Sequence, residues 1–182
     1  MSLHTLRDVF VEQLKDIYSA ENQILKALPK LAKAASSPDL REGFEKHLEQ
    51  TRTHVERLEQ VMGTINETSK GKKCKGMEGL LEEGKETLEM KGEASPAALD
   101  AAMIADAQRV EHYEIAVYGT LCAYAKQLGM RDAMELLNQT LLEEERTDER
   151  LSEIAAQVNL EAAEAQPEES SGQRGRKTRT AR

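Results

Sequence analysis

Apolar side chains recur at alternating intervals of four and three residues along several long stretches of the chain. In the first stretch they are Phe10, Leu14, Ile17, Ile24 and Leu28. This spacing places them on one face of a helix that packs in a bundle. Glu21 occupies the remaining position of that seam, where an apolar residue is expected. The pattern therefore predicts a core-facing helix that carries an acid on its apolar face.

Turn signals separate this helix from further long helices. Residues 36–39 are Ser-Ser-Pro-Asp, which supplies N-cap candidates and a proline for the first helical turn, so a second helix is expected over about residues 40–62. Residues 95–96 are Ser-Pro and repeat that signal. The helix that they begin is expected to end near Gly129, because glycine suits the position that follows a helix C-terminus.

The connection between these helices is long. Residues 64–75 are polar and basic and predict a loop, residues 76–90 predict a shorter helix, and Asp132 with Glu135 predicts the cap of a final helix over about residues 133–158. Short loops make neighbouring helices antiparallel, and one long crossover is typical of ferritin-like bundles. The fold predicted for residues 1–160 is therefore all-α: a ferritin-like antiparallel four-helix bundle with a long crossover that carries a short fifth helix.

Composition agrees with one helical domain. The chain has 182 residues, of which 39% are hydrophobic and only 3% aromatic, and this balance favours helices over sheets. The two cysteines are read as reduced thiols. The N-terminus shows no basic segment followed by an apolar one, and no apolar run reaches membrane-spanning length. We therefore expect a soluble cytoplasmic protein without a membrane partner.

The formal net charge of -8 conceals a basic C-terminus. Residues 161–182 are expected to form a disordered tail. Its cationic side chains are Arg174, Arg176, Lys177, Arg179 and Arg182. A solubility role is favoured over phosphate contacts with nucleic acid, because no aromatic residue is interleaved for base stacking.

Two further acids lie on an apolar helix face. Glu111 and Glu114 share that face with Ala107, Tyr118 and Leu121. Ionised glutamate is seldom fully buried unless its charge is compensated. Either this face is not the core face, or the core holds partners for both acids.

A weak internal repeat relates the second and the last long helix and identifies candidate partners. It aligns Gln50 with Glu144 and His54 with Asp148. The members of each helix are four residues apart and therefore lie close together on one helix face. His47 shares the His54 side of the second helix.

This distribution of acids and imidazoles over four helices is typical of di-iron and di-manganese bundles, in which carboxylates bridge two cations. The predicted cofactor is two iron or manganese ions, whose charge would neutralise acids in the core. The predicted metal ligands are Glu21, His54, Glu111, Glu114, Glu144 and Asp148. A literal Glu-x-x-His motif is missing, because Thr51 and Gln50 stand three and four residues before His54.

A metal-free hypothesis stays open beside the metal site. The acids at residues 143–145 are consecutive, which is typical of a solvated helix face, and buried acids can also pair with Arg, Lys or His. The chain would then be a non-catalytic structural or interaction protein. The sequence specifies no reaction, so it does not decide whether the protein is an enzyme.

Five segments of the chain carry a family resemblance. They are Asp16–Glu21, His47–Glu49, Met77–Leu80, Val110–Ile115 with Tyr118–Thr120, and Thr140–Asp148. They resemble the YciE/YciF family of bacterial ferritin-like proteins, and the resemblance covers about residues 3–158. It implies a homodimer in the bacterial cytoplasm, a link to stress responses, and a kinship with rubrerythrins and manganese catalases, whose di-metal centres handle iron or peroxide. It also implies Glu at position 50 and commonly Gln at position 54, so that Gln50 and His54 either exchange an oxygen ligand for a nitrogen ligand or mark a degraded site.

Overall fold

A computed structural model describes residues 3–69 and 72–165 of the chain. In these residues it contains five helices and no strand. The helices are α1 (Leu6–Ala34), α2 (Pro38–Thr64), α3 (Lys75–Glu89), α4 (Pro96–Gln127) and α5 (Arg131–Glu164). The predicted all-α class is confirmed.

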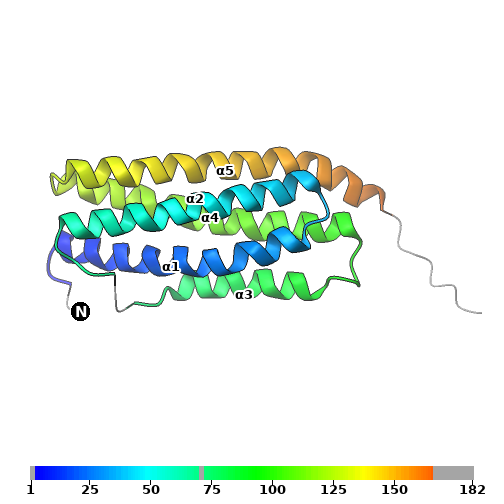
Figure 1. The fold of residues 1–182 in the computed structure, drawn as a ribbon, viewed down its shortest axis with the longest axis horizontal. Coiled ribbons are helices and arrows are strands. Elements are labelled where there is room, and N and C mark those ends of the chain that lie inside the picture. The colour runs from blue at the N-terminus through cyan, green and yellow to red at the C-terminus, as the bar shows by residue number, and fades with distance from the viewer. Residues whose placement is uncertain (1–2, 70–71, 166–182) are drawn as a thin grey trace, which may run out of the picture.

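The four long helices form two antiparallel hairpins, α1 with α2 and α4 with α5 (Figure 1). Helices α1 and α5 run in one direction, and α2 and α4 run in the opposite direction. This arrangement arises because the chain returns along the bundle between α2 and α4. Helix α3 lies in that return segment and packs on the outside of the bundle against α1 and α4. The predicted ferritin-like topology with one crossover and a short fifth helix is confirmed.

Local chemistry explains where the helices begin and end. The side chains of Ser37 and Ser95 each accept a hydrogen bond from a backbone N–H in the first turn of α2 and α4, and a proline follows each serine. Gly129 has a φ of 71°, in the left-handed region that glycine adopts without strain. The next backbone N–H, that of Met130, donates to the carbonyl of Ala125 at 2.9 Å and closes the end of α4.

The start of α5 differs from the prediction. The helix begins at Arg131, with Met130 in the N-cap position and without a side-chain hydrogen bond at the cap. The predicted capping role of Asp132 is therefore wrong. Asp132 lies inside the first turn, where a carboxylate interacts favourably with the positive end of the helix dipole.

Helix α5 also continues past its predicted end near Val158, to Glu164. The predicted boundary between bundle and tail, at residue 160, consequently falls inside a helix. The basic cluster predicted for the tail lies outside the described residues. In the part of the chain that the structure describes, no helix is both long enough and apolar enough to cross a membrane.

The predicted seams form the core of the bundle. All five apolar seam residues of α1 are buried, and Glu21 is buried among them with 0% exposure. On α4, Glu111 is 1% exposed and Glu114 is 0% exposed. The face that carries these acids is therefore the core face, which decides between the two interpretations of α4.

Candidate metal centre

Six ionisable side chains from four helices meet inside the bundle, and we call them the carboxylate–histidine cluster. They are Glu21 of α1, His47 and His54 of α2, Glu111 and Glu114 of α4, and Glu144 of α5. Each residue is at most 3% exposed. Burial of so many ionisable groups requires that cations, hydrogen bonds or protonation compensate their charge.

Helical spacing explains how α2 and α4 present their members of the cluster. His47 and His54 are seven residues apart, about two helical turns, so both rings project from the same side of α2. Thr51 lies between them, and its hydroxyl donates to the carbonyl of His47 at 2.9 Å. On α4, Glu111 and Glu114 are three residues apart and share the buried face.

The potential ligand atoms form two groups that share one residue. The atoms within each group lie within 4.8 Å of one another. The first group comprises His47, Glu111, Glu114 and Glu144. The second comprises Glu21, His54 and Glu144. Glu144 is the residue common to both groups, so it is the one that could contribute to two cation sites, as a carboxylate does in carboxylate-bridged bundle sites.

Both imidazoles lie between acids. His47 Nδ1 is 3.1 Å from Glu111 Oε1, and His47 Nε2 is 3.5 Å from Glu144 Oε2. His54 Nδ1 is 3.0 Å from Glu144 Oε1 and 3.6 Å from Glu21 Oε1. Glu144 therefore contacts both histidines, one through each carboxylate oxygen.

Several buried polar atoms of the cluster have no hydrogen-bond partner among the described residues. They are Glu21 Oε2, His47 Nε2, His54 Nδ1, Glu111 Oε2, and both carboxylate oxygens of Glu114 and Glu144. His54 Nδ1 and Glu144 Oε1 are close, but their angles do not suit a hydrogen bond. Buried polar atoms without partners are rare in folded proteins. Oxygen and imidazole nitrogen donors that converge in this way fit divalent iron or manganese.

Charge balance agrees with two cations in the cluster. Four ionised carboxylates carry four negative charges, and two divalent cations with neutral imidazoles would balance them. Protonation is the alternative compensation. Burial alone would lower the pKa of both histidines, but the adjacent carboxylates overcome this effect and raise the pKa of His47 well above its ordinary value and that of His54 to about 10.

The pKa values of Glu111 and Glu114 shift in one direction and that of Glu144 shifts in the other. Burial raises the pKa of Glu111 to about 7, although His47 partly opposes the shift. Burial and the neighbouring carboxylates of Glu144 and Glu21 raise the pKa of Glu114 well above its ordinary value. Burial also favours the neutral form of Glu144, but the two histidines dominate and lower its pKa to about 2. Without metal, the core is therefore expected to hold imidazolium rings, an ionised Glu144 and a neutral Glu114.

A second layer of side chains orients His54. Its Nε2 is 2.9 Å from Glu143 Oε2, and Arg57 donates two hydrogen bonds to the Glu143 carboxylate, at 2.7 and 2.9 Å. The guanidinium lowers the pKa of Glu143, so this carboxylate is ionised and accepts the Nε2–H of His54. The other ring nitrogen, Nδ1, then faces the cluster, as in the carboxylate–histidine–metal arrangement.

Tyr118 orients Glu21 in a similar way. The hydroxyl is fully buried and donates to Glu21 Oε1. The Tyr118 ring also meets the His54 ring edge to face, with 6.4 Å between centroids. Glu21 Oε2 is left as the free ligand atom of this carboxylate.

The structure brings five of the six predicted ligands together, but not Asp148. This half-buried side chain accepts a hydrogen bond from Gln108 at 3.2 Å, and its other oxygen lies 3.3 Å from His112 Nε2. Four residues along α5 rotate a side chain by about 40° and move it by about 6 Å relative to Glu144. The short aspartate therefore faces α4 instead of the cluster.

The sixth member of the cluster, His47, was not in the predicted ligand set. The available signal was its spacing of seven residues from His54 on one side of α2. Gln50, which lies between them in sequence, belongs to neither ligand group and is half-buried beside a cavity.

Sequence comparison identifies relatives over most of the chain. The family model described as domain of unknown function DUF892 matches residues 5–164. Protein YciF of Escherichia coli (strain K12) is 49% identical over 156 residues, which cover 85% of this chain and 93% of YciF.

Solved structures show the same fold. The crystal structure of the E. coli stress protein YciF matches with a TM-score of 0.83 and 46% identity, over 87% of this chain and 99% of that chain. YcfI from Rhodopseudomonas palustris matches with a TM-score of 0.78 and 43% identity, over 83% and 95% of the two chains. A two-domain protein from Anabaena variabilis with a ferritin-like domain shares the fold at 18% identity and a TM-score of 0.57, over 90% of this chain and 41% of that chain. The chain therefore belongs to the DUF892 family, and its predicted resemblance to the YciE/YciF proteins is confirmed.

Proposed function

We propose that this YciF-like protein binds two iron or manganese ions in the carboxylate–histidine cluster and handles iron or peroxide in a stress response. The observation that carries the proposal is the pair of ligand groups that share Glu144. The unpartnered buried oxygen and nitrogen atoms in both groups support it, because each has a lone pair to offer a cation.

In this proposal His47, Glu111 and Glu114 would hold one ion, Glu21 and His54 would hold the other, and Glu144 would be available to both. Bound iron or manganese would supply reversible one-electron redox chemistry. Each of these ligands is at most 3% exposed.

Neighbouring side chains set the geometry and the proton count of the proposed site. Tyr118 holds Glu21, and Glu143 holds His54, through the hydrogen bonds described above. Metal binding would displace protons from the two imidazoles and from Glu114, because ligand atoms must be deprotonated.

Metal content tests the proposal. The protein should be produced with added iron or manganese, and metal per chain should be measured by elemental analysis. We expect about two ions per chain in the wild type, no bound ions after Glu144→Ala, and one after Glu21→Ala. Glu145→Ala is the matched control, because this neighbouring acid is exposed and should leave the content unchanged. Equal metal content in all four proteins would contradict the proposal. Peroxide consumption by the loaded wild type then tests the reaction.

A second candidate is a non-catalytic structural or interaction protein whose core acids are paired without metal. The contacts of His47 with Glu111 and of His54 with Glu144 favour it, because two imidazolium rings would neutralise two carboxylates. The two candidates differ in one measurement. If added iron or manganese leaves the thermal midpoint of the metal-free protein unchanged, the structural role is favoured.

We also propose that the protein acts as a homodimer in the cytoplasm, as the family resemblance implies. Light scattering coupled to size-exclusion chromatography would measure the mass in solution. A mass of one 20.3 kDa chain at micromolar concentration would contradict the dimer.

A further inference from the structure

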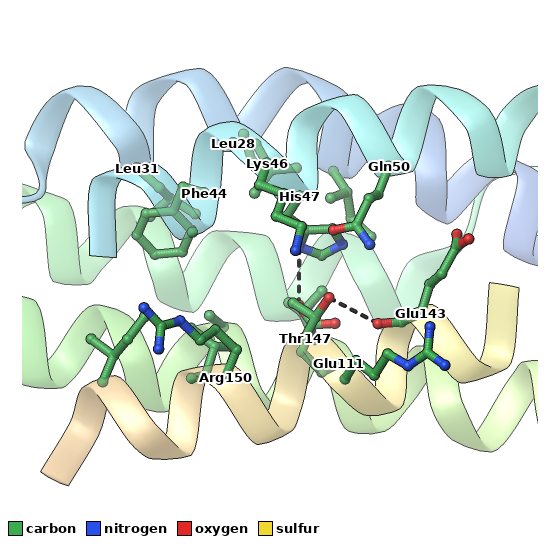
Figure 2. A pocket seen from close by; sticks show the side chains of 18 of the residues that line it. Leu28, Leu31, Phe44, Lys46, His47, Gln50, Glu111, Glu143, Thr147 and Arg150 are labelled. Carbon is green, nitrogen blue, oxygen red and sulfur yellow. Dashed lines mark hydrogen bonds and ion pairs between the residues drawn. The ribbon is translucent and has the colours of Figure 1, made fainter. Parts of the chain in front are cut away.

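A cavity of about 250 Å³ lies beside the carboxylate–histidine cluster, and its wall includes His47 and Glu111. Figure 2 shows it from the side where α2 and α5 lie in front. Leu31, Phe44 and Arg150 lie toward one end, and Gln50 and Glu143 lie toward the other. One end of the cavity therefore combines apolar side chains with Arg150, the other end is polar, and His47 and Glu111 lie between them.

The cavity is larger than dioxygen or peroxide requires. A water molecule takes about 30 Å³ of liquid, so the space corresponds to roughly eight water-sized atoms. An organic molecule with about eight to ten non-hydrogen atoms would fill it.

Large aliphatic and aromatic side chains of α1, α2 and α5 form much of the apolar part of the wall. They are Ile24, Leu28, Leu31, Phe44, Leu151 and Ile154. Gly43 of α2 adds to this space, because a Cβ atom at this position would meet only Ile154 Cδ1, at 3.6 Å. Glycine inside a helix is less stable than alanine, so the missing side chain is consistent with a need for room.

Three cationic side chains line the cavity, together with the acids Glu111 and Glu143. Lys46 and Arg146 line the cavity, are exposed, and form no ion pair with any of the described residues. Arg150 also lines it but is paired with Glu153 at 2.9 Å. Lys46 and Arg146 are therefore available for an anion whose apolar part enters the cavity.

We propose that this cavity binds an aliphatic monocarboxylate of about six to eight carbon atoms. Its carboxylate lies at Lys46 and Arg146, where a guanidinium can form two parallel hydrogen bonds with it. Its chain lies along the walls of Leu28, Phe44 and Ile154. None of these contacts involves a metal ion, so the site goes beyond the proposed metal function.

Calorimetric titration of the full chain with hexanoate and octanoate tests the site. Each additional buried CH₂ should raise the affinity by roughly fourfold until the cavity is full. Octan-1-ol, which has the chain but not the charge, should bind about tenfold more weakly than octanoate. Titration before and after chelator treatment should agree, since the site needs no metal.

Two pairs of variants make the test specific. Arg146→Ala should weaken octanoate binding by about tenfold, whereas Arg131→Ala, at an exposed arginine of the same helix outside the cavity, should leave it unchanged. Gly43→Leu should fill the cavity and abolish binding, whereas Gly43→Ala should retain it. Circular dichroism of each variant checks that the bundle is folded.

Three results would overturn the proposal. They are a lack of binding by octanoate, an affinity independent of chain length, and undiminished binding by a folded Gly43→Leu protein. Each is distinguishable from a failure of the metal proposal, because metal content is measured separately on variants of Glu144 and Glu21.

Discussion

The two hairpins of the bundle contribute unequally to the carboxylate–histidine cluster. The α1–α2 hairpin supplies one carboxylate and two imidazoles, and the α4–α5 hairpin supplies three carboxylates. Imidazole is neutral when it binds a metal and cationic when it is protonated. When protonated, the imidazoles of the first hairpin offset part of the negative charge of the carboxylates of the second hairpin. When neutral, they leave that charge to be balanced by cations.

The asymmetry is sharpest between α2 and α5, which the internal repeat aligns. On α5 the residue that enters the cluster is Glu144, but its counterpart Gln50 on α2 does not enter. Instead, α2 contributes His47, three residues before Gln50, and His54, four residues after it, to the cluster. Two helices related by a weak sequence repeat thus present different faces to the same site.

Substitution of the aligned residues Glu144 and Gln50 by leucine is expected to give the largest difference between α5 and α2. Glu144→Leu should abolish metal binding and should destabilise the metal-free protein by about 3–5 kcal/mol, because two buried imidazoles lose their shared counterion. Gln50→Leu should keep both ions and change the stability by less than about 1 kcal/mol. Urea unfolding and elemental analysis measure both effects, and equal losses in the two variants would contradict this asymmetry.

The stability of the metal-free protein should depend on pH through His54 of α2 and Glu111 of α4, whose pKa values are both raised. The folded-state pKa of His54 is raised to about 10, above its ordinary 6.5. Its contribution to the stability of the metal-free protein is therefore fully present below pH 6.5 and is lost as the pH rises through about 10. Glu111, raised to about 7, acts in the same direction because its buried neutral form is favoured. Unfolding of the metal-free protein at pH 6, 8 and 10 should show a steady loss of stability.

Metal binding should have the opposite pH dependence, because the cations compete with those protons. The apparent affinity should rise by about tenfold per pH unit between pH 7 and 9 for each imidazolium that must lose its proton. Competition with a chelator measures this slope, and His54→Gln should reduce it. An affinity that falls as the pH rises would contradict the assignment.

Substitution of Glu143, which orients His54, should have an intermediate effect on metal affinity, and this effect should be confined to one ligand group. Glu143→Gln should weaken binding of the ion in the Glu21–His54 group by about 10–100-fold, because the carboxylate that fixes the His54 ring is lost. The ion in the His47 group should keep its affinity. Stepwise chelator titration resolves the two ions, with Glu145→Gln as the control. Equal weakening of both ions would show that Glu143 does not act through His54.

The smallest effect is expected at Asp148, the residue that the repeat aligns with His54. Asp148→Asn should leave two ions per chain and change the stability by less than about 1 kcal/mol, because the side chain contacts only partly exposed residues of α4. Elemental analysis and urea unfolding measure both. Loss of one ion from the Asp148→Asn protein would show that Asp148 is a metal ligand.

Residue patterns within single helices predicted much of the site. The seam of α1 placed Glu21 among core residues, and the seam of α4 did the same for Glu111 and Glu114, because burial of a helix face follows the helical period. The three consecutive acids of α5 were harder to separate. Glu144 is buried, Glu143 is half-buried and binds Arg57, and Glu145 is exposed. Neighbouring residues on a helix differ by about 100° in direction, so only contacts with other helices distinguish their roles.

Residue patterns along the chain were sufficient to predict the helices, their order, the crossover and the acids that lie on core faces, because these depend on local capping and on the spacing of apolar residues. The packing of the helices was needed to show that Glu144 belongs to two ligand groups, that His47 belongs to the cluster while Asp148 does not, and that a cavity lies beside the cluster. These features depend on the rotation and separation of α2, α4 and α5 relative to one another. A rotation of a helix by a few tens of degrees replaces one inward-facing side chain by another three or four residues away. The spacing of apolar residues within a single helix does not determine that rotation.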